Sequence, residues 1–151
     1  MQQTKYLLCL IAENLAPQLV LPLDFGLFLV LWLVQLIIYP GFYDIAETTF
    51  ISWHFTYVKR IMLFVLPLMA GQLTMHAALF YAAPSFMEAL ILLLILMAWT
   101  VSLFWSAPCH KQLHEQGRSE KIISSLLLSN LLRTICWTAV FLLTLYTRWL
   151  S

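Results

Sequence analysis

Four long apolar stretches, separated by short polar segments, follow one another from about residue 19 to residue 149. They cover approximately residues 19–39, 61–82, 86–107 and 122–149. Each has the roughly 20 apolar residues that a helix needs to cross a bilayer. The stretches are Leu-rich and lack the period-two alternation of a β-barrel strand. The pattern therefore predicts an all-α polytopic membrane protein, one domain over residues 1–151, with four transmembrane helices in an antiparallel bundle.

Prolines mark the expected helix ends. Pro40-Gly41 follows the first stretch, Pro84 follows the second, and Pro108 is expected to close the third. Before the first stretch, the short apolar run of residues 6–12 is interrupted early by polar residues. We therefore expect this run to be retained as an interfacial helix that leads into the first span, rather than removed as a signal peptide.

The segment of residues 44–60 allows two interpretations. It is rich in aromatic residues, which favour the membrane–water boundary. It either lies along the membrane face as an interfacial helix or extends the second transmembrane helix. Because nothing between Ser52 and Leu63 breaks a helix, we favour the long, extended helix, with a kink at Pro67.

Composition supports a membrane location and excludes some functions. The chain is 62% hydrophobic and only 10% charged, whereas soluble domains have about a quarter charged residues. The lipid bilayer is therefore an expected partner, and a homo-oligomer or a membrane partner protein remains open. The formal net charge of +1 argues against nucleic acid as a partner. Three cysteines form no disulfide framework and no CxxC motif.

Lysine and arginine are unevenly distributed between the two ends of the predicted bundle. Arg133 lies inside the fourth stretch, and the N- and C-terminal end carries Lys5 and Arg148. The loops at the other end carry five cations, Lys59, Arg60, Lys111, Arg118 and Lys121. By the positive-inside rule, these loops are cytoplasmic and both termini are non-cytoplasmic.

Arg133 is the first candidate functional residue. It lies about 11 residues into the fourth stretch, where a charge costs roughly 2.5–3.5 kcal/mol and needs a partner. Asn130 and Trp137 share its helix face. One interpretation is a structural clamp, and the other is a site for an anion or a substrate. The expected partners of Arg133 lie near the same end: Gln35, Tyr39, Asp44 and Glu47.

Three histidines form the second candidate group. His110 and His114 are four residues apart, a spacing that can hold one metal on a helix face, and His54 leaves the membrane on the same side. Glu47 or Glu115 could complete a site for iron, copper or zinc. The pattern allows a metal or haem site, and equally solvated interfacial histidines without a cofactor, since no HExxH or CxxC accompanies it.

The remaining polar residues of the spans are assigned structural roles. His76 has no partner histidine, and we interpret it as interhelical packing. Gln35 and Gln72 are expected to make interhelical hydrogen bonds. Asp24 and Glu88 lie at helix ends, so a proton-coupled exporter is not favoured. Aromatic residues in the spans either anchor and fill the bundle or line a flat pocket for a quinone or polyketide-like ring: Trp32, Tyr39, Trp99, Trp105 and Trp137.

Several short motifs carry a resemblance to a known family. They are YPGF (residues 39–42), WHFTYVKRIMLFVLPLMAGQ (53–72), APCHKQLHEQG (107–117) and SNLLRT (129–134). Together they resemble the small four-helix bacterial membrane proteins related to the anthrone-oxygenase-like family. That family has a proline after the first helix, a Pro-polar-polar stretch after the third and Asn-x-x-Arg in the fourth. The positions that match these features here are Pro40, Pro108 with His110 and Leu113, and Asn130 with Arg133.

The resemblance implies a location in the bacterial inner membrane. It also implies cofactor-independent oxygenation of an aromatic substrate. Where the family has asparagines after the third-helix proline, this chain has Cys109 and His110.

Two functional hypotheses follow, and whether the chain is an enzyme stays open between them. In the first, the protein is a redox or oxygenase-type membrane protein with a polar site at the cytoplasmic end. The catalytic candidates are Arg60, Asn130 and Arg133, and the candidate metal ligands or acid–base groups are His54, His110 and His114. In the second, the chain is a non-catalytic membrane subunit or scaffold whose polar residues serve helix packing and partner docking.

Overall fold

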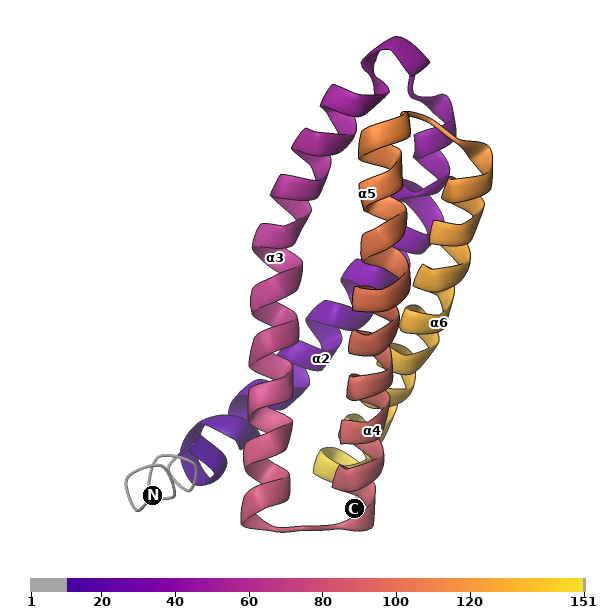
Figure 1. The fold of residues 1–151 in the computed structure, drawn as a ribbon. Helices are drawn as coiled ribbons and strands as arrows, with labels where there is room; N and C mark the ends of the chain where they lie inside the picture. Colours follow the sequence, from indigo (N-terminus) through magenta and orange to yellow (C-terminus); the bar gives the residue numbers. More distant parts are fainter. Residues whose placement is uncertain (1–10, 151) are drawn as a thin grey trace.

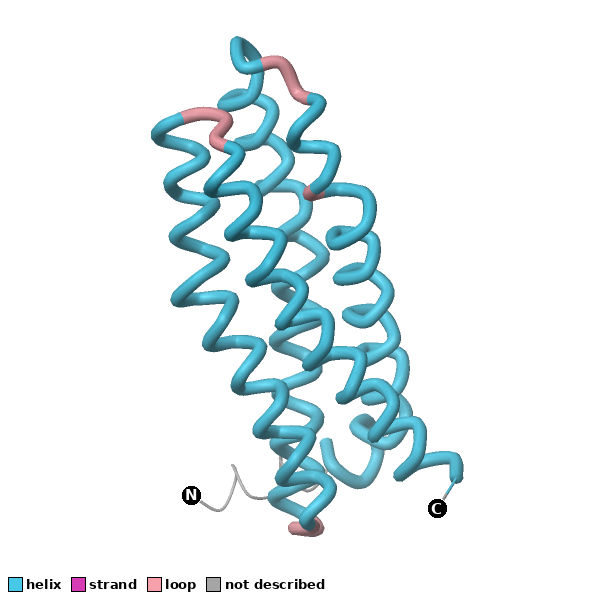
Figure 2. Tube along the Cα trace, turned by 90° about the vertical axis from the view of Figure 1, so that its right-hand side faces the viewer, coloured by secondary structure: helices cyan, strands magenta, loops and turns pink. Residues whose placement is uncertain are grey.

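The protein is a bundle of four long helices, as seen in a computed structural model that describes residues 11–150 (Figure 1). Within these residues there is no strand, and the helices run alternately up and down (Figure 2). Four helical segments are long and apolar enough to cross a membrane: Glu13–Asp44, Glu47–Ala82, Phe86–Gln116 and Glu120–Arg148. The predicted fold class is therefore confirmed. The expected interfacial helix over residues 6–12 lies almost entirely outside the described residues.

The first transmembrane segment is helical in four consecutive pieces. A π-helical turn, η1 (Ile11–Leu15), leads into α2 (Ala16–Leu33), and a second π-helical turn, η2 (Val34–Ile38), continues it. The 3₁₀ helix η3 (Pro40–Asp44) then turns the chain. The 3₁₀ helix begins at Pro40, where the sequence predicted the end of the first span. Proline has no N–H and therefore cannot continue the hydrogen-bond ladder of the helix.

The second segment is one uninterrupted helix, α3 (Glu47–Ala82), of 36 residues. At 1.5 Å per residue it is about 54 Å long, well beyond the roughly 30 Å of a hydrocarbon core. The structure thus supports the long helix over a separate interfacial segment for residues 44–60. The helix continues through Pro67, and a kink there stays a prediction.

The third segment continues past the point where its end was predicted. It consists of α4 (Phe86–Val101), a π-helical turn η4 (Ser102–Ser106) and α5 (Ala107–Gln116). The prediction that Pro108 closes this helix is wrong. Proline clashes with the carbonyl four residues before it in a regular helix, and the wider turn directly ahead of Pro108 gives the ring room. The helix ends instead at Gly117, which has a φ of 82°.

The fourth segment, α6 (Glu120–Leu145), ends in the π-helical turn η5 (Tyr146–Leu150). It packs against both α2 and α4, and α2 also packs against α3. We call the end with η3 and the α5–α6 connection the loop end, and the end with the α3–α4 turn and η5 the terminal end (Figure 1). Most large side chains on the outer faces are apolar and exposed, as a lipid-covered surface requires.

Candidate functional site

Two clusters of polar side chains lie inside the bundle, one toward each end. The loop-end cluster consists of Tyr39, His54, His110, Asn130 and Arg133. Four of the six residues assigned to a site from the sequence belong to it: His54, His110, Asn130 and Arg133. The terminal-end cluster was not predicted as a site, because Asp24 and Glu88 were expected at helix ends. That expectation is wrong for Asp24, which is fully buried in the middle of α2.

Arg133 is 7% exposed and projects from α6 into the bundle. Its Nη1 donates to the hydroxyl of Ser106 at 3.3 Å, and its guanidinium carbon lies 5.3 Å from the Trp137 ring centroid. Its Nε is buried without a hydrogen-bond acceptor. The Tyr39 hydroxyl, one of its expected partners, also interacts with the guanidinium. Neutral hydroxyls and an aromatic face stabilise a cation far less than a carboxylate does.

No carboxylate of the described residues pairs with Arg133. Glu47, one of its expected partners, instead accepts from Arg118 Nη2 at 3.0 Å. Arg118 also donates to the backbone carbonyl of Tyr43 at 2.7 Å. The Arg118 contacts hold the α5–α6 connection to the end of the first segment. The positive charge of Arg133 has no carboxylate partner among the described residues.

Asn130 shares the helix face of Arg133, as the sequence spacing predicted. Its Nδ2 donates to Gln35 Oε1 at 2.9 Å and faces the backbone carbonyl of Leu31 at 3.3 Å. The expected interhelical role of Gln35 is thereby confirmed. Asn130 Oδ1 is buried and has no donor. The side chain thus fastens α6 to the first segment and keeps an acceptor unused beside the cavity.

A cavity of about 140 Å³ adjoins this cluster. Its polar wall includes Tyr39, His110, Asn130 and Arg133. The rest is mainly apolar, and the part toward the outside is formed by three exposed side chains, Met62, Leu66 and Leu103. The cavity thus lies between α3 and the third segment and reaches the surface that faces lipid.

Tyr39, His110 and His54 form a chain of hydrogen bonds. The Tyr39 hydroxyl lies 3.0 Å from His110 Nε2, and His110 Nδ1 lies 3.0 Å from His54 Nε2. Tyr39 is 3% exposed and His54 is 1% exposed. Because a neutral imidazole donates at one nitrogen and accepts at the other, this chain can pass a proton from the cavity wall as far as His54, whose Nδ1 is buried without a hydrogen-bond partner among the described residues.

Arg60 does not join this cluster, and His114 is not part of its hydrogen-bond chain. His114 does line an outer hollow together with His54 and His110, the three histidines that the sequence grouped. His114 is exposed on α5 and stacks on the ring of Phe55 at 5.3 Å between centroids. Arg60 is exposed and lines an outer groove next to Tyr57 rather than the cavity. Within residues 11–150, no three histidine, cysteine or acidic side chains gather closely enough to hold a metal ion.

The aromatic residues have separate roles. Trp99 lines the cavity together with Tyr39, and its Nε1 has no acceptor. Trp32 donates to Thr138 at 3.1 Å, and Trp105 donates to Ser125 at 2.9 Å. Only part of the aromatic set therefore faces a common space.

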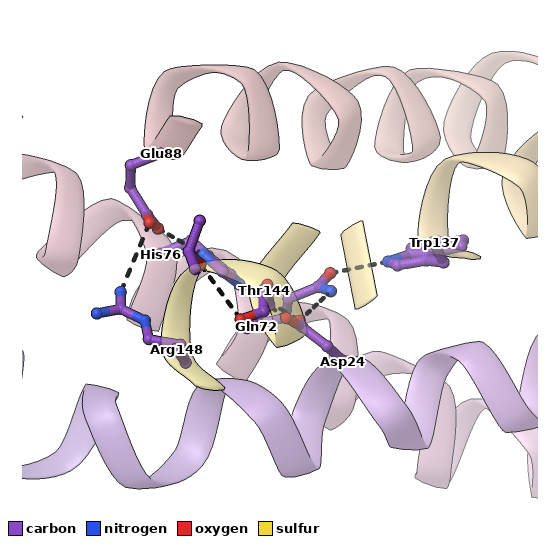
Figure 3. A network of polar contacts seen from close by, with 8 residues as sticks. Asp24, Gln72, His76, Glu88, Trp137, Thr144 and Arg148 are labelled. Atoms are coloured by element: carbon purple, nitrogen blue, oxygen red, sulfur yellow. Dashed lines mark hydrogen bonds and ion pairs between the residues drawn. The ribbon is translucent and has the colours of Figure 1, made fainter. Parts of the chain in front are cut away.

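The terminal-end cluster is centred on His76, which is fully buried (Figure 3). Its Nδ1 lies 2.6 Å from Glu88 Oε1, and its Nε2 lies 3.2 Å from Asp24 Oδ2. Arg148 Nη2 approaches the other Glu88 oxygen at 3.6 Å. The role of His76 is interhelical, as expected, but its partners are two carboxylates from other helices, which the search for a partner histidine missed.

A further hydrogen-bond chain connects the two clusters. Gln72 Nε2 donates to Asp24 Oδ1 at 2.6 Å, and Gln72 Oε1 accepts from Trp137 Nε1 at 2.8 Å (Figure 3). The ring of Trp137 in turn faces Arg133. The predicted interhelical hydrogen bonds of Gln72 are confirmed. One sequence signal could have revealed the terminal-end cluster. Several ionisable residues occur near the same end of three apolar stretches.

The fold and the site together define a four-helix membrane-type bundle with a mainly apolar cavity that has polar side chains on one wall. Comparison of the chain with protein-family models, curated proteins and solved structures finds no match.

Proposed function

We propose that this chain is an integral membrane protein of redox or oxygenase type that binds the ring of a lipophilic phenol or quinol in the loop-end cavity. The protein takes the proton of the ring hydroxyl and holds the resulting anion beside Arg133. The supporting observation is a buried arginine without a carboxylate partner at the wall of an otherwise mostly apolar cavity. An anionic ligand oxygen would supply the missing counter-charge.

The cavity dimensions support a ligand with one ring inside the bundle. Its volume is about 140 Å³, and an apolar protein cavity of roughly 150 Å³ holds one benzene molecule. The exposed side chains at its outer wall, Met62, Leu66 and Leu103, let an apolar tail extend into the bilayer. A phenol or quinol with an alkyl tail fits this description.

The hydrogen-bond chain supports removal of a proton from the ligand. In one arrangement Tyr39 donates to His110, and His110 donates to His54. In the other, His54 donates to His110, His110 donates to Tyr39, and the Tyr39 hydroxyl is free to donate toward the cavity. Going from the first arrangement to the second, Tyr39 takes the proton of the ligand and passes its own to His110, His110 passes its Nδ1 proton to His54 Nε2, and His54 gives up the proton of its Nδ1. His54 Nδ1 is buried without a hydrogen-bond partner among the described residues, so the last transfer needs water to reach this nitrogen.

Arg133 supplies the electrostatic part of the proposal. A cation fixed in a water-poor site stabilises a developing phenolate or enolate more than the neutral hydroxyl. The anion is the electron-rich form that gives up an electron to an oxidant such as dioxygen. This chemistry agrees with the cofactor-independent oxygenation that the resemblance to the anthrone-oxygenase-like family implies.

A bacterial inner membrane with the loop end in the cytoplasm is part of the same proposal. It is supported by the excess of lysine and arginine at the loop end. The competing hypothesis, a non-catalytic subunit in a homo-oligomer or with a membrane partner protein, has no specific use for an unpaired cation beside a cavity.

The test uses a nitrophenol carrying a decyl chain, whose visible absorption reports the phenolate. In nanodiscs of neutral lipid, we expect wild-type protein to produce a phenolate band that saturates at one probe per chain. Arg133→Gln should lower the affinity for the phenolate at least about tenfold, the loss of one charge-assisted hydrogen bond. Lys59→Gln removes an exposed cation at the same end and is the matched control.

A second variant separates loss of binding from loss of folding. Leu103→Trp places a large side chain on the lipid-facing wall of the cavity without touching Arg133. We expect it to fold and to lose the probe. Equal phenolate bands in wild-type, Arg133→Gln and Leu103→Trp protein would overturn the proposal and favour the non-catalytic subunit.

A further inference from the structure

The terminal-end cluster takes no part in the proposed ligand chemistry. We infer that Asp24, His76 and Glu88 form a binding site for one exchangeable proton inside the bundle. The site lies toward the opposite end from the cavity and is built from three helices, α2, α3 and α4 (Figure 3).

The hydrogen bonds of His76 require more hydrogens than a neutral ring and two ionised carboxylates supply. Both ring nitrogens of His76 face carboxylate oxygens, at 2.6 Å and 3.2 Å. Each contact needs one hydrogen between its two atoms, because two lone pairs at that distance repel. A neutral imidazole with two ionised carboxylates supplies only one. The trio must therefore hold one more proton, on the ring or on a carboxyl group.

Neighbouring side chains determine where some of the hydrogens of the trio lie. The indole of Trp137 can only donate, so Gln72 presents its oxygen to Trp137 and its Nε2 to Asp24. Asp24 Oδ1 is thus an acceptor, and Oδ2 faces His76 Nε2. The additional proton is then best placed between His76 Nδ1 and Glu88, the shortest contact of the trio.

The charge balance supports the same count. The charged or titratable groups at the site are Asp24 from α2, His76 from α3, Glu88 from α4 and Arg148 from η5. With the proton bound, their charges sum to zero. Without it, a net negative charge would remain among side chains that are almost wholly buried, which is costly in an apolar interior.

The geometry also gives the proton a path. Asp24 and His76 are fully buried, whereas Glu88 is 6% exposed and its second oxygen faces the partly exposed Arg148. Glu88 lies in the first turn of α4, next to the α3–α4 turn. The proton therefore exchanges with water at the terminal end through Glu88.

The test is the nitrogen-15 NMR spectrum of histidine-labelled protein in nanodiscs at pH 7.5, with the His76 signal assigned by its loss in His76→Gln. We expect a His76 ring protonated at both nitrogens, or an infrared band of a protonated carboxyl that disappears in Glu88→Gln. A neutral ring together with two ionised carboxylates in the wild-type protein would overturn the proposal, whether or not any variant folds.

Glu88→Gln provides a sharper comparison. Its amide can donate to Nδ1, so the hydrogen count closes with a neutral imidazole, and we expect His76 to become neutral. Glu115→Gln removes an exposed carboxylate near the loop end and should leave the His76 signal unchanged. Exchange of the bound proton with water is measured by saturation transfer from the water signal to the His76 ring protons. No transfer in the folded protein would show a static salt bridge and would also overturn the proposal.

Discussion

A single buried arginine has the largest energetic consequence among the residues of the loop-end cluster. Arg133 at this depth costs a few kcal/mol, and Ser106 and the Trp137 ring offset only part of that cost. A structural clamp would hydrogen-bond the guanidinium to loop carbonyls or extend it to the membrane interface, whereas Arg133 is buried and its hydrogen bond and ring contact are to side chains. The unpaired cation is more easily explained by a ligand that supplies the counter-charge.

The two histidines of the HxxxH pair should differ sharply in their effect. His110 bonds Tyr39 and His54 beside the cavity, whereas His114 is exposed on the outside of α5. We expect His110→Ala to weaken binding of the decyl nitrophenol as its phenolate about five- to tenfold, as expected for a lost hydrogen bond. His114→Ala should bind the probe like wild type. The measurement is the phenolate absorption titration in nanodiscs.

Elemental analysis and an absorption spectrum of protein purified without chelators give an independent check on the same pair. Stoichiometric iron, copper or zinc that disappears in His110→Ala would mean that the histidines bind a metal rather than relay a proton. Equal loss of phenolate binding in His110→Ala and His114→Ala would likewise contradict the proton-relay role.

Residue spacing predicted part of this site and missed the rest for a clear reason. A shared face of one helix follows from periodicity, so Asn130, Arg133 and Trp137 were placed together from the sequence alone. The contact of His76 with Asp24 and Glu88 joins three helices, and spacing within one helix carries no information about it. The sequence placed all three near one end but could not show that they meet.

At the scale of helices, the third segment decides whether a site can form. Had it ended at Pro108, His110 would lie in a loop. The π-helical turn η4 lets the helix continue through the proline and brings His110 against Tyr39 and His54. Proline usually signals a helix end, and the local widening that overrides it leaves no distinct mark in the sequence. The long α3, by contrast, was predictable because nothing interrupts its pattern.

The backbone conformation of Gly117, at the end of α5, should make this position intolerant of other residues. Gly117 has a φ of 82° and a ψ of −161°, a region that only glycine adopts readily. Gly117→Ala should lower the free energy of unfolding by about 1–3 kcal/mol. Ordinary van der Waals contact with Ile51, at 3.8 Å from an added Cβ, adds little to this cost. The measurement is the unfolding midpoint in a titration of detergent micelles with sodium dodecyl sulfate.

Gly41 is the matched control for this effect. It lies in the turn at the same end of the bundle, its φ is not positive, and an added Cβ would meet nothing within 4 Å. Gly41→Ala should therefore unfold at the wild-type midpoint or slightly above it. A Gly117→Ala midpoint equal to that of Gly41→Ala would show that the backbone at the α5–α6 connection relaxes without cost.

At the scale of the whole molecule, the two clusters place the proposed anion site and the proposed proton site toward opposite ends of the bundle. Gln72 and Trp137 join them through hydrogen bonds and a ring contact. An indole ring does not relay protons, so this link is mechanical and electrostatic rather than a proton path. Gln72 contacts both the Trp137 ring that faces Arg133 and the Asp24 carboxylate, so a shift of Asp24 would act on the position of that ring.

The orientation of the bundle decides which side of the membrane each cluster serves, and it gives the last prediction. Five lysines and arginines at the loop end outnumber Lys5 and Arg148 at the terminal end. We therefore expect a C-terminal alkaline phosphatase fusion, expressed in bacteria, to be active and a C-terminal green fluorescent protein fusion to be dark. The proton site would then exchange with the non-cytoplasmic side, and the ligand cavity would lie nearer the cytoplasm.

Reversing the charge difference between the two ends tests the cause of this orientation. Lys59→Gln, Arg60→Gln and Lys111→Gln, together with added lysines after Ser151, should shift a measurable fraction of fusions to the opposite pattern. A fluorescent, phosphatase-inactive wild-type fusion would place the terminal end in the cytoplasm, and the proton bound by Asp24, His76 and Glu88 would then come from there.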